Sequence, residues 1–126
     1  MNEKIKAFYD LKVWKDAHKL TIEIYKATNE FPNEEKFGLV SQKRRSASSI
    51  GANIAEGFGR FHYKDKIKFY QQARSSAVEL QNHIFLAKDL GYLSEIDARE
   101  LFAQTSLVLK EINGLIAAIN KQRENS

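Results

Sequence analysis

The sequence predicts an all-α fold, an up-down antiparallel four-helix bundle. The chain has 126 residues, which fit one domain of ordinary size. One Pro and six Gly provide few turn signals, whereas a sandwich of many hairpins would need such residues at every turn. Four segments instead carry apolar residues at steps of three and four, and the links between them are short. Short links make consecutive helices antiparallel neighbours, so residues 1–126 are expected to form a single bundle domain.

The first helix is predicted over residues 11–30. Asp10 is placed to cap its start, and Pro32 ends it because the residue before a proline is displaced from the α region. The apolar face repeats at helical spacing and comprises Val13, Ala17, Leu20, Ile24, Ala27 and Phe31.

The second helix is predicted over residues 34–58, with Asn33 as its cap and Glu34 and Glu35 at the positive end of its dipole. Residues 46–52 are nearly all small, which predicts the close approach of a neighbouring backbone. Gly57 and Gly59 are expected to end this helix. The apolar arc comprises Phe37, Val40, Ala47, Ile54, Ala55 and Phe58, widened by Leu39 and Ile50.

The third and fourth helices are predicted over residues 63–90 and 95–120. Gly91 follows the third as a C-terminal stop, and residues 94–97 have the form of a capping box that opens the fourth. Regular apolar stripes run along both helices. The third helix has Ile67 and Phe69 at its head, followed by Tyr70, Ala73, Ala77, Leu80, Ile84 and Ala87. The stripe of the fourth comprises Ala98, Leu101, Phe102, Thr105, Val108, Leu109, Ile112, Leu115, Ile116 and Ile119.

Composition excludes several classes of protein. Hydrophobic residues at 43% and charged residues at 29% are typical of a globular domain. The amino-terminal residues alternate charged and apolar types and form neither a signal peptide nor a membrane span, so we expect a cytoplasmic protein without a membrane partner. The absence of Cys removes disulfides and thiolate chemistry and fits a reducing compartment.

No residues form a recognisable catalytic or metal-binding pattern. His18, His62 and His83 fall on different segments, and the spacing from Glu79 to His83 is one residue too long for the di-iron pair of helical bundles. A phosphate-binding loop is also missing. We therefore expect no catalytic residues, no metal, no cofactor and no enzymatic activity.

The middle of the chain is strongly basic. Residues 43–74 hold eight basic residues against two acidic ones, Glu56 and Asp65. Convergent cations bind nucleic acid because neutralising phosphates releases counterions, and the aromatic residues at 61–63 could stack on unpaired bases. The alternative is a solvated face whose cations pair with the two acids or with a partner subunit. The predicted nucleic-acid-binding residues are Lys43, Arg45, Arg60, Lys64, Lys66, Lys68 and Arg74.

Arg44 is the remaining cation of this stretch and projects into the apolar arc of the second helix, seven residues after Phe37. Either it pairs with a buried carboxylate such as Glu79, or it lies at a contact between subunits. The same interface or buried-ion role is predicted for Ile50 and Gly51, because small and apolar residues surround Arg44.

Four motifs resemble a known family. They are Leu11-x-Val13-Trp14-x-x-Ala17, Phe31-Pro32-x-x-Glu35-x-Phe37-Gly38-Leu39, the stretch from Gln42 to Arg60, and Leu86-Ala87-x-x-Leu90-Gly91-Tyr92-Leu93. These residues are similar to the bacterial four-helix bundle proteins encoded in intervening sequences of 23S ribosomal RNA genes.

The resemblance implies a bundle that assembles as a ring-like homopentamer. It also implies a relation to the accessory variability protein of diversity-generating retroelements, which binds nucleic acid and a reverse transcriptase partner. A role in binding or assembly carries over to Arg44, Arg45 and Arg60, which match the motif. Relatives tend to have Arg-Ser where this chain has Phe61-His62, so the surface of that corner differs.

Together these observations predict a non-catalytic, oligomeric bundle that binds RNA or DNA. The alternative function is a protein-interaction scaffold that binds an acidic partner or a reverse transcriptase without touching nucleic acid.

Overall fold

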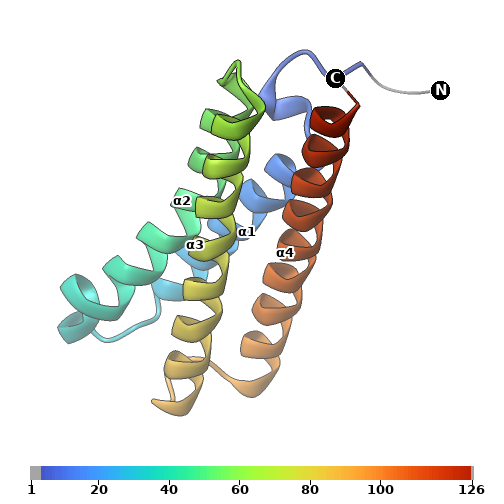
Figure 1. The fold of residues 1–126 in the computed structure, drawn as a ribbon. Helices are drawn as coiled ribbons and strands as arrows, with labels where there is room; N and C mark the ends of the chain where they lie inside the picture. Colours follow the sequence, from blue (N-terminus) through green and yellow to red (C-terminus); the bar gives the residue numbers. More distant parts are fainter. Residues whose placement is uncertain (1–3, 126) are drawn as a thin grey trace.

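Four long helices form an antiparallel bundle in the computed structural model, which describes residues 4–125 (Figure 1). The predicted fold class is confirmed. The helices are α1 (Lys12–Thr28), α2 (Ser41–Gly59), α3 (Tyr63–Asp89) and α4 (Glu95–Glu124). Within residues 4–125 no helix combines the length and apolarity that crossing a membrane requires.

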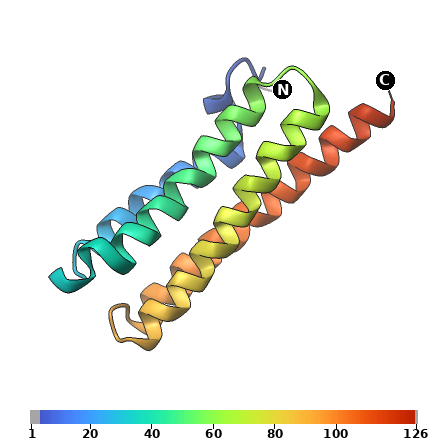
Figure 2. The ribbon, with the colours of Figure 1, turned by 60° about the vertical axis from the view of Figure 1, so that its left-hand side comes forward.

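Each helix packs against two others, so the bundle has four seams. Consecutive helices are in contact, and α1 also contacts α4. The α2–α3 seam therefore lies opposite the α1–α4 seam. The α2–α3 link lies at one end of the bundle, and the α1–α2 connection and the α3–α4 turn lie at the other (Figures 1 and 2).

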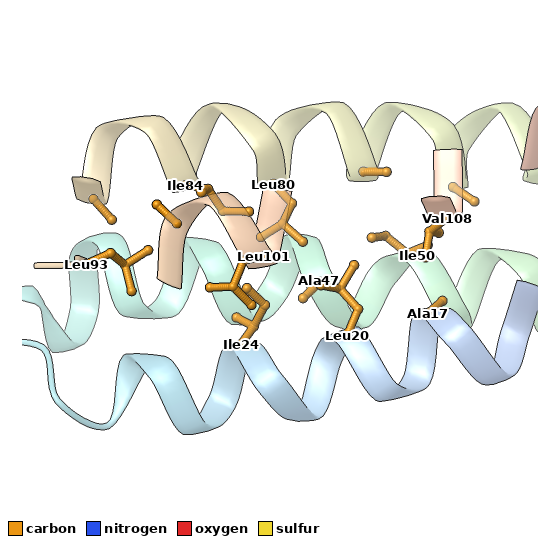
Figure 3. Close-up of a cluster of buried hydrophobic side chains, with 14 of the residues drawn as sticks. Ala17, Leu20, Ile24, Ala47, Ile50, Leu80, Ile84, Leu93, Leu101 and Val108 are labelled. Carbon is orange, nitrogen blue, oxygen red and sulfur yellow. The ribbon is translucent and has the colours of Figure 1, made fainter. Parts of the chain in front are cut away.

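The core follows the predicted apolar stripes along the bundle axis. Figure 3 shows side chains from all four helices meeting there, among them Leu20, Ile50, Leu80 and Val108. Burial of this apolar surface is the main force that holds the helices together. The residues without measurable exposure include Ala17, Leu20, Ile24, Ala47, Ile50, Ile54, Ala73, Ala77, Leu80, Ala87 and Ile112.

The start of α2 differs from the prediction. Asn33 does not cap a long helix; it begins a 3-10 turn, Asn33–Glu35, and a π-helical turn, Lys36–Val40, precedes α2. Gly38 has non-helical backbone angles, with φ −105° and ψ −107°. This change of register turns Phe37 outward, where it is 89% exposed, so its assignment to the apolar arc was wrong. Leu39 and Val40 are buried as predicted.

Asp10 caps a different element from the one predicted. Its carboxylate accepts hydrogen bonds at 3.0 Å from the backbone amides of Lys6 and Ala7, upstream of a 3-10 turn at Phe8–Asp10. These two donors lower the pKa of Asp10. The N-cap of α1 is Leu11, whose side chain has no capping oxygen.

The turn between α3 and α4 is built as predicted. Gly91 has φ +82°, in the left-handed region that favours glycine, and the amide of Tyr92 donates to the carbonyl of Ala87 at 2.9 Å. Ser94 then caps α4, because its hydroxyl oxygen accepts from the amide of Asp97 at 3.1 Å.

Gly57 is a contact glycine, although the sequence indicated a helix stop. The helix continues through it to Gly59. A Cβ at Gly57 would lie 2.6 Å from Cε1 of Tyr70, which is 1% exposed, and 3.1 Å from Cβ of Phe69. Farther along the same seam Ser49 donates to the hydroxyl of Ser76 at 2.7 Å. The tightest contact of α2 with α3 therefore lies at Gly57, beyond the small residues 46–52 where the sequence predicted it, and within that stretch Ser49 meets α3 by a side-chain hydrogen bond.

We predict that Gly57→Ala destabilises the protein by about 1 to 3 kcal/mol, because the new methyl group overlaps a fully packed ring. Gly59→Ala is the matched control, since nothing lies within 4 Å of a Cβ there. That variant should be neutral or more stable by up to about 1 kcal/mol. Urea unfolding of both variants measures the difference, and equal midpoints would contradict the contact with Tyr70.

Candidate nucleic-acid interface

Five of the eight cations in residues 43–74 lie on the surface. Arg45 and Arg60 belong to α2 and its end, with side chains 65% and 47% exposed. Lys64, Lys68 and Arg74 are exposed residues of α3. Their predicted positions on the surface are confirmed, and their role in binding remains a prediction.

A polar groove runs along the α2–α3 seam. Arg45 from α2 and Lys68 from α3 are its two cations, and Glu79 is its one carboxylate. The rest of its lining is amide and hydroxyl: Ser49, Asn53, Gln71, Gln72, Ser75 and Ser76. Such groups hydrogen-bond both phosphate and sugar oxygens, so the groove has the chemistry of a site for a nucleic-acid backbone.

A second hollow continues the groove toward the α2–α3 link. It is lined by Lys64, Asp65, Ile67, Lys68, Gln71 and Arg123. Lys68 and Gln71 line both hollows, so the two hollows form one surface. Three cations follow one another along it: Lys64 and Lys68 from α3, and Arg123 from α4. We call this continuous surface the α3 groove. Arg74 is exposed but lines neither hollow.

Sequence reasoning missed Arg123. It lies about 50 residues after the basic stretch, in the last turn of a helix that was expected to end near residue 120. The antiparallel topology could have revealed it, because the end of α4 lies beside the start of α3 in such a bundle.

An exposed aromatic tip adjoins the α3 groove. Phe61 is 90% exposed in the α2–α3 link, and its ring meets the ring of His62 edge-on at 5.2 Å. Arg60 beside it lies 4.6 Å over the ring of Phe69 and pairs with Glu56 at 3.2 Å. Lys64 is the second residue of α3, so a cation and an exposed ring stand at one corner.

Arg45 is paired inside the groove. Its guanidinium lies 3.4 Å from the carboxylate of Glu79, which is also 3.3 Å from Nε2 of His83. Glu79 was the partner proposed for Arg44, and the structure gives it to Arg45 instead. Exposed ion pairs of this kind contribute little stability, so a phosphate can displace Glu79 at low cost.

Lys43 cannot belong to a nucleic-acid surface, which corrects the prediction. It is fully buried, and its ammonium donates to the carbonyl of His83 at 3.3 Å and lies 5.4 Å from the ring centre of Phe31. No carboxylate pairs with it among residues 4–125, and burial lowers its pKa to about 8. The sequence could not reveal this burial, because it depends on how α3 covers that face of α2.

Lys66 is also a structural cation. Its ammonium donates to the carbonyl of Phe58 at 2.7 Å and to that of Gly57 at 3.4 Å. It therefore satisfies the last turn of α2, where the helix dipole favours a positive charge. Partial burial lowers the pKa of Lys66.

Arg44 ties α2 to the end of α1, and no carboxylate within residues 4–125 pairs with it. Its guanidinium donates to the hydroxyl of Thr28 at 2.8 Å, to the side-chain oxygen of Asn29 at 3.0 Å and to the carbonyl of Tyr25 at 3.3 Å. It also stacks over the Tyr25 ring at 4.6 Å. The expectation of a buried ion pair is corrected to a cationic cap on the C-terminus of α1.

Ile50 and Gly51 likewise face the interior of their own bundle rather than a neighbouring copy. Ile50 has no exposed surface, and a Cβ at Gly51 would lie 3.4 Å from the indole nitrogen of Trp14. Their predicted interface role is therefore replaced by packing within the chain.

Among residues 4–125, no group of three or more His, Cys, Asp or Glu side chains is arranged to hold a metal ion. Two carboxylates do lie close together between α1 and α4, but a lysine joins them. The ammonium of Lys12 lies 2.7 Å from the carboxylate of Asp16 and 2.9 Å from that of Glu111. This geometry holds the two helices together.

The burial of Lys43 should make the stability of the protein depend on pH in an unusual way. The Lys43 pKa of about 8 in the folded state lies below its ordinary value of 10.5, so the unfolded chain binds more protons between these values and stability rises with pH. We expect the free energy of unfolding to increase by about 2 kcal/mol from about pH 7 to pH 9.5. The upper limit stays below 10.0, the ordinary pKa of tyrosine, so ionisation of Tyr70 in the unfolded chain changes the free energy by only about 0.2 kcal/mol.

Lys43→Met isolates this contribution. It should be more stable than the parent near pH 7, because no charge is buried, and the difference should shrink toward pH 9.5. Denaturant melts at several pH values measure it, and parallel pH profiles for the two proteins would refute the burial of a charged ammonium.

Arg44→Ala should lower the free energy of unfolding by about 1 to 3 kcal/mol, because three hydrogen bonds at the end of α1 are lost. Arg45→Ala is the adjacent control and should change it by less than about 1 kcal/mol, since its ion pair is exposed. Circular dichroism melts of both variants measure the two changes in stability. Equal melting of the two variants would show that Arg44 is not a structural residue.

Comparisons with known proteins give a family and a fold. The sequence model of the 23S rRNA-intervening sequence protein family matches residues 9–114. A crystal structure of a protein of unknown function from the S23 ribosomal protein family of Bacteroides thetaiotaomicron superimposes with a TM-score of 0.75 at 22% identity. The superposition covers 82% of this chain and 97% of that one, which shows a shared fold. No curated protein matches the chain.

Proposed function

Because this chain belongs to the 23S rRNA-intervening sequence protein family, we propose that it is a non-catalytic bundle that binds RNA through its α3 groove. The family match confirms the resemblance carried by the four motifs. The family name supports RNA, rather than DNA, as the first ligand to test.

The α3 groove is the observation that carries the proposal. Lys64, Lys68 and Arg123 give it a row of cations, and the neighbouring amides and hydroxyls can bind phosphate and 2′-hydroxyl oxygens. The amides of Asn53, Gln71 and Gln72 could pair with a base edge, but the major groove of an A-form RNA duplex is too deep and narrow for side chains to read. Recognition by shape and backbone contacts therefore fits better than recognition of a base sequence.

The aromatic tip adds a place for an unpaired base. Phe61 is 90% exposed beside Lys64, and rings in this setting stack on bases of single-stranded loops. A structured RNA in which a duplex ends in a loop would place its backbone in the groove and a loop base on Phe61.

Replacing Lys64 and Lys68 together with Ala should weaken RNA binding and leave folding unchanged, because both side chains are exposed. The two contacts should also reduce the slope of log affinity against log salt by about 1.4 to 1.8. The measurement is a titration of an RNA hairpin at several salt concentrations, with single-stranded DNA as a second probe.

Lys15 and Lys19 provide the matched control. They are also four residues apart and exposed, but they belong to α1. Lys15→Ala with Lys19→Ala removes the same charge and should keep both affinity and slope nearer to those of the parent. If both double variants lose binding equally, attraction is non-specific and the groove is not the site. A parent protein that binds no RNA would overturn the proposal, and the protein-interaction scaffold would then be the function to test.

A further inference from the structure

Glu79 is the one carboxylate of the hollow between α2 and α3, and it lies where a phosphate would bind. Its oxygen Oε1 lies 3.4 Å from the guanidinium of Arg45, which belongs to α2, and 3.3 Å from Nε2 of His83, one turn further along α3. An arginine guanidinium binds carboxylates and phosphates through the same parallel N–H donors. Glu79 and an RNA phosphate therefore compete for Arg45.

His83 keeps Glu79 inside the groove by a contact that does not involve Arg45. The imidazole side chain is 14% exposed, and its Nδ1 is buried without a hydrogen-bond partner among residues 4–125. A proton on Nδ1 would be a buried donor without an acceptor, so the favoured tautomer carries its proton on Nε2. This N–H donates to Glu79. The carboxylate therefore keeps one partner when Arg45 binds another anion.

Two cations of the α3 groove, Lys64 and Lys68, are open where Arg45 is closed. Among residues 4–125 no carboxylate forms an ion pair with either lysine. An RNA held at these lysines presents its next phosphates to Arg45 at a high effective concentration, because they belong to the same strand. That concentration offsets the advantage that Glu79 has from being tethered to the protein.

We propose that Glu79 is a competitive gate, which closes Arg45 in the free protein and yields it to a phosphate of the bound RNA. This inference rests on the proposed function, since it assigns a regulating residue to the same groove. Lys64 and Lys68 bind first, and Arg45 joins them once Glu79 is held by His83 alone. Glu79 thereby sets both the affinity of the groove and the number of its phosphate contacts.

The first test compares Glu79→Gln with the parent protein in titrations of an RNA hairpin at several salt concentrations. The variant keeps the size of the side chain and removes the charge that competes for Arg45. Its affinity should rise by about three-fold, within the range that an exposed ion pair supplies. The slope of log affinity against log salt should steepen by up to about 0.9, the value of one added phosphate contact.

Glu23→Gln is the matched control. The side chains of Glu23 and Glu79 are 39% and 41% exposed, and each forms an ion pair with one exposed cation, Lys26 or Arg45. Both changes raise the net charge by one, but Glu23 belongs to α1. Glu23→Gln should keep the affinity and the slope close to their parental values. Equal gains from the two changes would overturn the proposal, because general attraction would then explain them.

A double-mutant cycle with Arg45→Ala tests the route by which Glu79 acts. Both side chains are exposed, so neither change should unfold the protein. If Glu79 acts through Arg45, Glu79→Gln should add no affinity to a protein that already carries Arg45→Ala. A carboxylate that only repels RNA would give the same gain in both backgrounds, and that result would overturn the gate while leaving RNA binding by the groove intact. An absence of RNA binding by the parent would overturn the proposed function and the gate together.

Discussion

The close contact between α2 and α3 is the constraint on which the rest of the structure depends. Gly57 allows the ring of Tyr70 to lie where a Cβ would otherwise be, and Ser49 and Ser76 meet across the same seam. Because the two backbones approach so closely, the polar side chains that flank the seam form one groove rather than two separate helix faces. The part of the α3 groove between α2 and α3 therefore follows from packing at small residues, and the rest lies between α3 and α4.

Helix packing around α2 also determines which cations of residues 43–74 are withdrawn from the surface. Near the link Lys66 reaches back to the last carbonyls of α2, and at the far end Lys43 lies beneath α3 against the carbonyl of His83. Arg44 holds the end of α1 on the other side of α2. Three cations of the basic stretch thus stabilise helix ends or fill the interior, and the field that faces solvent is weaker than the count of charges indicates.

Most of the fold could be predicted from the sequence, because it rests on local signals. Apolar spacing located the four helices, and Gly91 and Ser94 marked the α3–α4 turn correctly. The errors arise where tertiary contacts decide the outcome. A helical wheel places Lys43 relative to its own helix only, so it cannot show that a neighbour covers it. The π-helical turn at Lys36–Val40 changed the register and carried Phe37 from the predicted core to the surface.

The candidate site shows the same division between local and tertiary information. Lys64 and Lys68 share a face by spacing alone, and the structure confirms that both are exposed. Arg123 joins them only because the bundle brings the end of α4 beside the start of α3.

Conversely, the charges near each exposed ring are fixed by sequence: cations surround Phe61, and acids precede Phe37. The bundle then separates these two rings to opposite ends, because one lies in the α2–α3 link and the other before α2 (Figure 1). The length of α2 therefore keeps two exposed rings with different charged neighbours far apart.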